Sequence, residues 1–216
     1  MGIPVLIYGR SGTGKSRSLK NFGEDEITLI NVEKKPLPFR KKFKYIINTD
    51  NYNTVCRALN ETPSNIVIID DAGYLLTNMF MREHSARGSG AATFDLYNDL
   101  GDRFWNLFET IKALPDNKIV YVIMHEEEND SGTTKLKMLG KLLEQKVCVE
   151  GMVTIVIRCM CDGQRHYFCL HNSGRDITKT PEDMFETDEI ENDLKAVDSA
   201  IRKYYEIEVN KNDTTV

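Results

Sequence analysis

The amino-terminal stretch contains the feature that most constrains the fold of this chain. An apolar run, Ile3–Tyr8, is followed by the pattern G-x-x-x-x-G-K-S, from Gly9 to Ser16. The glycines allow the backbone to curl so that successive N–H groups point at one anion, and a helix that opens after the loop adds the positive end of its dipole. A strand, a glycine-rich loop and a helix in this order predict a phosphate-binding loop in an α/β fold.

The side chains of this loop predict a bound nucleoside triphosphate with a magnesium ion. Lys15 is expected to reach the β- and γ-phosphates, and the Ser16 hydroxyl to ligate an Mg²⁺ ion that bridges them. We therefore expect ATP and Mg²⁺ as cofactors. The residues expected to contact the nucleotide are Gly9, Arg10, Ser11, Gly12, Thr13, Gly14, Lys15, Ser16 and Arg17.

A second apolar run supplies an acidic partner for the loop. Ile66–Ile69 is hydrophobic and β-branched at every position, and Asp70 and Asp71 follow it. Such a run predicts a parallel strand that is buried on both faces. An acid at the end of that strand, beside a phosphate loop, is the Walker B arrangement, in which Asp70 holds the magnesium ion. Asp71, the second of the two acids, is one candidate for the general base.

Two further strands are expected to end in polar residues near the loop. Ile27–Val32 leads into Glu33, and Lys118–Met124 leads into His125. The carboxyl ends of parallel strands meet at one edge of a sheet, where α/β folds bind their ligands. We therefore expect Glu33, Asp70 and His125 to converge on one triphosphate.

The remaining patterns predict two helices, a loop and a hairpin. Apolar residues at helical spacing predict amphipathic helices over Phe94–Leu114 and Asp188–Tyr205. Thr77–Thr93 has no clean period and is predicted to be a long loop, either functional or disordered. Met152–Met160 and Arg165–Leu170 predict a β-hairpin.

Together these elements predict an α/β fold with a mostly parallel central sheet flanked by helices. A carboxy-terminal antiparallel hairpin and a final helix complete it. We expect one nucleotide-binding core over residues 1–180, and an acidic helix with a frayed tail, residues 181–216, packed on that core.

Composition limits the classes of partner. The net charge is −5, yet a short segment after Glu33 is strongly basic, which is typical either of a polyanion contact or of a solvated surface. Its basic residues are Lys34, Lys35, Arg40, Lys41, Lys42 and Lys44. No apolar run approaches the roughly 20 residues that a membrane span needs, so we expect no membrane contact. The five cysteines form no C-x-x-C pair and are expected to be structural thiols.

The order of strand ends resembles the RecA-type recombinase core. In that family the strand after the phosphate-loop helix ends in the glutamate that activates the attacking water, and Glu33 in Asn31-Val32-Glu33 matches it. A first DNA-binding loop leads into a long helix, as Thr77–Thr93 does here. The next strand ends in a polar sensor, matched by His125, which opens a second DNA-binding loop at roughly 126–139.

More narrowly, the chain resembles small phage-encoded AAA-type nucleotide-binding proteins, a group that includes RecA-like single-strand annealing ATPases. The resemblance rests on the early phosphate loop, the strand that ends in His125 and the closing pattern Thr178-Lys179-Thr180-Pro181. It implies an ATPase that acts on single-stranded DNA in phage recombination, annealing or replication. Glu33 would polarise the water, and His125 would sense the γ-phosphate. Asp71 remains the rival for the general base.

The resemblance also implies contacts beyond the nucleotide. The candidates for DNA contact are Arg82, His84, Arg87, Lys135 and Lys137. Arg175 and Lys179 are candidates for a trans-acting finger that reaches a neighbouring protomer's nucleotide, with plain surface charge as the alternative. We expect single-stranded DNA as a partner, together with a homo-oligomer and phage single-strand-binding or replication proteins. The expected location is the cytoplasm, that of the host cell if the chain is phage-encoded.

Two other classes of function remain open. The chain is alternatively a nucleotide-dependent interaction module that recruits a replication or packaging partner without touching DNA. A small-molecule kinase is the third possibility, since a phosphate loop alone does not exclude phosphate transfer to an acceptor.

Overall fold

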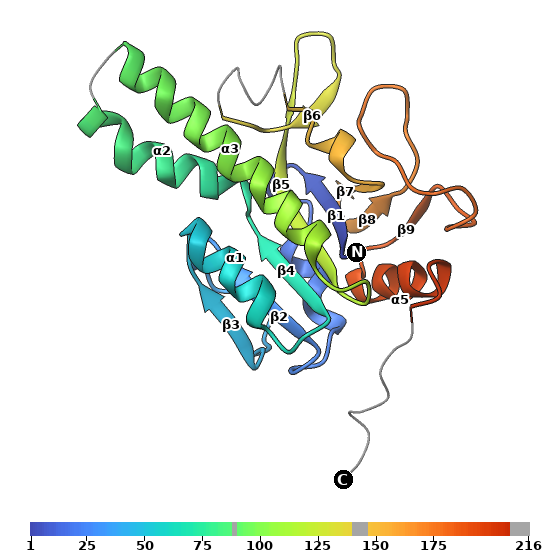
Figure 1. Ribbon diagram of the computed structural model, residues 1–216. Coiled ribbons are helices and arrows are strands. Elements are labelled where there is room, and N and C mark those ends of the chain that lie inside the picture. Colours follow the sequence, from blue (N-terminus) through green and yellow to red (C-terminus); the bar gives the residue numbers. More distant parts are fainter. Residues whose placement is uncertain (88–89, 140–146, 208–216) are drawn as a thin grey trace.

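The computed structural model describes residues 1–87, 90–139 and 147–207, and its central feature is one large sheet (Figure 1). The strands are β1 (Ile3–Gly9), β2 (Ile27–Asn31), β3 (Tyr45–Asn48), β4 (Ile66–Asp70), β5 (Ile119–Glu128), β6 (Thr134–Leu136), β7 (Ile155–Asp162), β8 (Arg165–Cys169) and β9 (Glu189–Glu191). The α-helices are α1 (Tyr52–Glu61), α2 (Gly73–Arg87), α3 (Ala91–Ala113) and α5 (Leu194–Tyr204). Two short 3₁₀ helices are η1 (Ser16–Asn21) and η2 (Glu150–Met152).

The sheet follows the order β3-β2-β4-β5-β1-β7-β8-β9, and β6 pairs with the end of β5. The pairs from β3 to β7 are parallel, whereas β8, β9 and β6 are antiparallel to their neighbours. This arrangement confirms the predicted α/β fold, with a mostly parallel sheet, carboxy-terminal antiparallel strands and a final helix. Because β5 lies between β1 and β4, its residue His125 pairs in register with Gly9, where the phosphate loop begins.

Helices cover both faces of the sheet. Along β1, Leu6 packs in the core on one face and Val5 in the core on the other, as expected for a strand buried on both sides. Helices α1, α2 and α3 cover the Leu6 face, and Figure 1 shows α3 running in front of the strands. The 3₁₀ helix η1 and helix α5 cover the other face. Within the described residues, no helix combines the length and the hydropathy needed to cross a membrane.

The prediction of a loop over Thr77–Thr93 is wrong for most of its length. Helix α2 runs to Arg87 and α3 begins at Ala91, while residues 88–89 lie outside the described part of the chain. α2 has only a weak apolar stripe, but it packs on α3, where the Phe80 ring stacks on Tyr97 with centroids 5.4 Å apart. Tertiary packing therefore supplies the helix stability that local pattern does not indicate.

The predicted second loop, residues 126–139, is also more regular than expected. β5 continues to Glu128, and β6 returns beside it with Glu126 opposite Leu136. A hydrogen bond closes the turn between them: the Gly132 N–H donates to the Asn129 carbonyl at 2.9 Å. The segment is a β-hairpin because its backbone groups pair with each other once β5 extends beyond the sheet.

The final helix begins later than the predicted Asp188. Glu189–Glu191 forms β9 instead, which pairs with β8 and so continues the sheet. Asp193 then caps α5: its carboxylate accepts from the backbone N–H groups of Lys195 and Ala196. An aspartate cap is a strong start signal, and the edge of β8 captures the residues before it. Residues 208–216, predicted to be frayed, lie outside the described residues.

The buried stripe of α3 gives a stability prediction. Phe104 is fully buried, whereas its neighbour Trp105 is 44% exposed. We expect Phe104→Ala to lower the free energy of unfolding by about 3–5 kcal/mol, since it leaves a cavity in the core. The matched control Trp105→Ala should lower it by less than about 1 kcal/mol. Urea unfolding followed by circular dichroism measures both, and equal losses would contradict the assignment of the buried face.

Candidate functional site

The loop between β1 and η1 has a backbone that requires glycine. Gly14 has a φ of 102°, a left-handed conformation that other residues rarely adopt. At Gly9 a Cβ atom would lie 2.4 Å from the Cys159 carbonyl oxygen, because β7 passes close behind the loop. The loop therefore packs closely on the sheet edge in a glycine-dependent conformation. Such a conformation allows backbone N–H groups to bind an anion.

The Lys15 ammonium group lies inside this loop. Its Nζ donates to the carbonyl oxygens of Gly9 at 2.9 Å and Arg10 at 2.8 Å, and it lies 3.5 Å from the His125 Nδ1. Burial lowers the pKa of Lys15, while nearby acidic groups, including Asp71 and Asp70, oppose that shift. A buried cation held at the mouth of the loop provides the positive charge that a phosphate group needs.

Ser16 and Asp70 form the pair predicted to hold magnesium. The Ser16 hydroxyl donates to the Asp70 carboxylate at 3.0 Å, so two hard oxygen ligands lie side by side. Burial and the adjacent Asp71 charge raise the pKa of Asp70 to about 6, and the Ser16 hydrogen bond only partly offsets them. A divalent cation would favour the ionised carboxylate there. The chemistry of this donor pair therefore fits Mg²⁺.

The donor set also limits which metal could bind. Within residues 1–87, 90–139 and 147–207, no three His, Cys, Asp or Glu side chains are grouped as metal ligands. All five cysteines are free; Cys159 is buried and Cys148 is exposed, so a structural role for all five stays a prediction. Mg²⁺ takes one or two protein oxygens and completes its shell with phosphate oxygens and water. The Ser16–Asp70 pair suits that pattern and not a site built entirely from protein ligands.

His125 and Lys35 hold the carboxylate of Asp71 from two sides. The His125 Nε2 lies 3.2 Å from the Asp71 Oδ1, and the Lys35 ammonium forms an ion pair with the Oδ2. Since Nε2 faces a carboxylate and Nδ1 faces the Lys15 ammonium, Nε2 donates and Nδ1 accepts. Burial would raise the pKa of Asp71, but the hydrogen bonds from His125 and Lys35 bring it down to about 2. Asp71 is therefore a fixed anion with both oxygens engaged.

Glu33 lies at the end of β2 and is tied to α2. The Asn78 amide donates to the Glu33 Oε1 at 2.9 Å and to the Asp50 Oδ2 at 3.1 Å. Glu33 is half-buried and its backbone follows the strand end as predicted. His125 contacts both Lys15 and Asp71, whereas the Glu33 carboxylate accepts from Asn78. Among the described residues no contact joins Glu33 to His125 or Asp70, so the convergence of all three on one triphosphate stays a prediction.

Arg10 and Arg17, both predicted to contact the nucleotide, have protein partners at the outer side of the loop. Arg10 forms ion pairs with Glu126, at 3.5 Å, and with Glu128, both on the β5–β6 hairpin. Glu126 is itself bound by Arg158 through two hydrogen bonds of 2.9 Å. The Arg17 Nη1 donates to the Asn192 carboxamide at 3.4 Å. These contacts fasten the loop to the hairpin on one side and to the segment before α5 on the other.

Three of the candidates for DNA contact, Arg82, Arg87 and Lys135, have acidic partners. The ion pairs are Arg82–Asp50 at 2.5 Å, Arg87–Glu83 at 2.7 Å, Arg87–Asp99 at 2.8 Å and Lys135–Glu127 at 3.1 Å. His84 stacks on the Phe80 ring with centroids 4.9 Å apart, and Lys137 is exposed. A polyanion would have to exchange with carboxylates at three of these positions.

The candidates for a trans-acting finger lie on the loop after β8. The Arg175 side chain is exposed, and its carbonyl accepts from the Thr134 N–H at 2.8 Å. Lys179 is half-buried, and its backbone forms a two-way bridge with Val156 of β7. A single chain tests neither as a finger, so both remain predictions.

Several site residues are not indicated by any sequence motif. Lys35 belongs to the basic segment. Its position just after Glu33, at the end of a strand predicted to reach the site, is a sequence signal that places it near the site. Asn78, Cys159, His166 and Asn192 reach the loop or its partners from elements far away in the chain. No local pattern marks them, because only the sheet order brings their elements to this edge.

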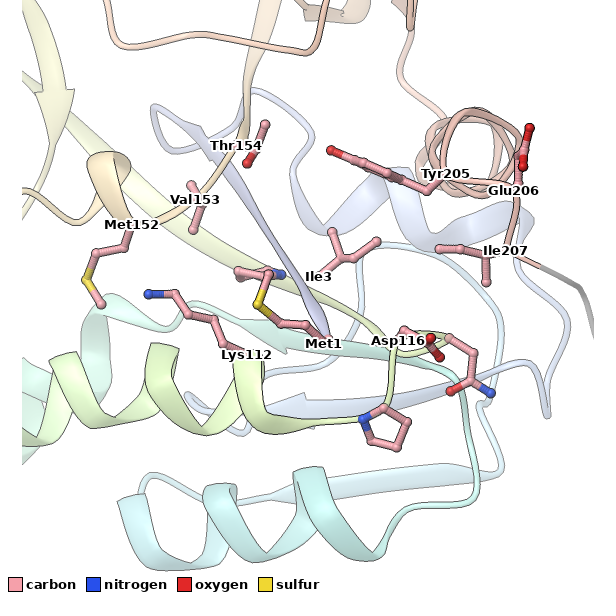
Figure 2. A pocket seen from close by; sticks show the side chains of 14 residues that line it. Met1, Ile3, Lys112, Asp116, Met152, Val153, Thr154, Tyr205, Glu206 and Ile207 are labelled. Atoms are coloured by element: carbon pink, nitrogen blue, oxygen red, sulfur yellow. The ribbon is translucent and has the colours of Figure 1, made fainter.

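A cavity of about 840 Å³ lies at the opposite edge of the sheet (Figure 2). Its lining includes residues that precede or begin β1, β5 and β7 and residues at the end of α5. Among them are Met1, Ile3, Lys112, Asp116, Thr154 and Tyr205. The cavity therefore belongs to the amino ends of the strands and is separate from the loop at their carboxyl ends.

Comparison with known proteins agrees with this geometry. The chain matches a protein-family model described as "AAA domain" over residues 1–190. That range covers the loop and the strands of the described residues, apart from the last residue of β9. Of the site residues described above, Asn192 lies outside it. A search of curated proteins returned no match.

The Lys15 position gives a direct test of nucleotide binding. We expect Lys15→Ala to weaken Mg-ATP binding by roughly 1.5–3 kcal/mol, because a charge-assisted hydrogen bond to phosphate is lost. Isothermal titration calorimetry measures this loss, with Lys20→Ala on η1 as the control and circular dichroism to verify folding. Unchanged affinity in Lys15→Ala would contradict the assignment of the loop.

Proposed function

Since this chain belongs to the AAA domain family of P-loop ATPases, we propose that it hydrolyses ATP at the edge where β1, β4 and β5 end, and that single-stranded DNA stimulates the reaction. One observation carries the first part. Lys15, the Ser16–Asp70 pair and the His125–Asp71 pair gather at one phosphate-binding loop. The Lys15 cation lies beside His125, which contacts Asp71, and the Ser16–Asp70 oxygen pair adjoins them along the chain at Lys15 and Asp71.

The chemistry assigns a separate task to each group. Lys15 and the loop N–H groups neutralise charge that develops on the phosphoryl oxygens, which supplies most of the rate enhancement in such reactions. Mg²⁺, when bound at Ser16 and Asp70, would neutralise the bridging oxygens further. His125 is proposed to detect the γ-phosphate, since it lies between Lys15 and Asp71. The Asp71 carboxylate keeps the imidazole in one orientation.

Glu33 is the better candidate for the general base. Asp71 is held by two donors, and its pKa of about 2 makes it a weak proton acceptor. Glu33 is bound by a neutral amide, which rotates away at little electrostatic cost. We therefore propose that Glu33 orients and deprotonates the attacking water once Asn78 releases it.

This assignment predicts different outcomes for two conservative variants. Glu33→Gln should bind Mg-ATP normally and hydrolyse it about 10²–10⁴-fold more slowly, because the proton acceptor is lost. Asp71→Asn should retain a faster rate than Glu33→Gln, since it weakens the contacts to His125 and Lys35 but leaves the proposed proton acceptor in place. Steady-state phosphate release measures both rates. A normal rate in Glu33→Gln together with a severe loss in Asp71→Asn would transfer the role to Asp71.

A chain of three contacts supports coupling to DNA. Arg82 donates to Asp50 at 2.5 Å, Asn78 donates to the same carboxylate at 3.1 Å, and Asn78 also donates to Glu33 at 2.9 Å. A DNA phosphate that bound Arg82 would leave Asp50 with more capacity to accept from Asn78. The Asn78 amide would then loosen its bond to Glu33. The resemblance to single-strand annealing ATPases supports a role in phage recombination, annealing or replication.

A second candidate function has an observation in its favour. Arg82, Arg87 and Lys135 are paired with carboxylates. These side chains therefore attract a polyanion less strongly than unpaired cations would. A nucleotide-dependent module that recruits a replication or packaging partner needs no DNA contact. Self-assembly, with Arg175 or Lys179 as a finger toward a neighbouring protomer, is compatible with either function.

The ATPase rate with and without single-stranded DNA separates the two. We expect stimulation that weakens with rising salt, because phosphate contacts release counterions. Arg82→Gln should remove most of the response to DNA, and because it frees Asp50 as DNA binding would, it should raise the basal rate toward the stimulated rate. Arg57→Gln is the matched control, as Arg57 is exposed on α1 and pairs with Glu61 at 3.9 Å. A flat response to DNA at every salt concentration would favour the interaction module.

A further inference from the structure

The side of the phosphate loop away from β5 is lined by residues that the predicted mechanism does not use. The His166 Nδ1 donates to the Thr13 carbonyl at 2.7 Å, and the buried Cys159 thiol donates to the same oxygen at 3.2 Å. A Cβ atom at Gly14 would lie 2.8 Å from the His166 Nδ1. The β8 imidazole therefore packs directly against the loop.

Asn192 completes this side from the segment between β9 and α5. It is 3% exposed, its amide nitrogen donates to the Cys159 Sγ at 3.3 Å, and its oxygen accepts from Arg17 at 3.4 Å. Both ends of the carboxamide are thus oriented by neighbours. The buried amide holds the Arg17 guanidinium just after the loop, at the start of η1.

The sheet order gives the two sides of the loop different roles. β1 has β5 and then β4 on one side, and β7, β8 and β9 on the other. The acidic, metal-binding and sensor groups all lie on the β4–β5 side. A triphosphate whose β- and γ-phosphates face that side has its α-phosphate and nucleoside directed toward β7–β9. There the polar groups are His166, Asn192 and Arg17.

We propose that His166, together with the Arg17 guanidinium that Asn192 positions, forms the nucleoside-binding side of the site and favours adenine. This rests on the proposed nucleotide function. Because the His166 Nδ1 donates to Thr13, the Nε2 of the neutral ring is a hydrogen-bond acceptor. Adenine carries an amino donor where guanine carries a carbonyl acceptor, so an acceptor selects the first. The planar guanidinium is suited to stacking on a base.

A binding experiment with three probes tests the proposal. Mg-ATP, Mg-GTP and Mg-tripolyphosphate are titrated by calorimetry, since tripolyphosphate reports the phosphate side alone. In His166→Asn the amide nitrogen replaces the Nδ1 donor and nothing replaces Nε2. We expect ATP to bind about tenfold more weakly, the preference over GTP to disappear and tripolyphosphate affinity to stay within about twofold. His166→Gln, which places an amide near Nε2, should restore part of the ATP preference.

The controls separate a nucleoside contact from a structural role. His171→Asn is the matched control, because His171 is exposed and bonds to Asp188 at 2.9 Å on the outer surface. Equal weakening of ATP and tripolyphosphate in His166→Asn would overturn the proposal, since His166 would then only support the loop. Unchanged ATP binding would overturn it as well. If the wild-type chain binds Mg-ATP more tightly than Mg-GTP, and His166→Asn loses that preference, this inference is supported even where the chain does not hydrolyse ATP. Absence of hydrolysis would then contradict only the proposed function.

Discussion

The network of Lys15, His125, Asp71 and Lys35 is the interaction on which the rest of the site depends. The Asp71 carboxylate is buried and is bound by His125 and by the exposed Lys35, while His125 also lies beside the buried Lys15 ammonium. Removing Lys15 or Asp71 would leave a buried partner unmatched, which is far more costly than losing a surface ion pair. The network joins the ends of β1, β4 and β5, and it is possible only because β5 lies between the other two. The order of the strands in the sheet therefore determines which side chains can form the site.

The same edge explains how an event elsewhere could reach the nucleotide. Glu33 is bound to α2 through Asn78, and Asn78 shares the carboxylate of Asp50 with Arg82. α2 also packs on α3 through the stacked rings of Phe80 and Tyr97. The hydrogen bonds involved are individually modest, and exchange of one acceptor for another is the kind of change that a small binding energy drives.

The two sides of the loop have distinct chemistry. Carboxylates, the Ser16–Asp70 pair and the His125 imidazole lie toward β4 and β5, whereas His166, Asn192 and the Arg17 guanidinium lie toward β7–β9. A nucleoside triphosphate has the same polarity, with its charge at one end and its base at the other. Under the proposal above, His166 of β8 and the segment that follows β9 would face the uncharged end of such a ligand.

The sequence alone determined the local features. The loop pattern, the apolar strands and the polar residues that follow them predict a phosphate site with Lys15, Ser16 and Asp70, because each signal lies within a few residues. It did not predict α2, whose stability comes from packing on α3, or β9, which forms only because β8 offers an edge. Only the tertiary structure decided that Lys35 pairs with Asp71, that Asn78 binds Glu33 and that His166 packs on Gly14. These pairs join residues whose spacing along the chain carries no information about distance until the sheet has formed.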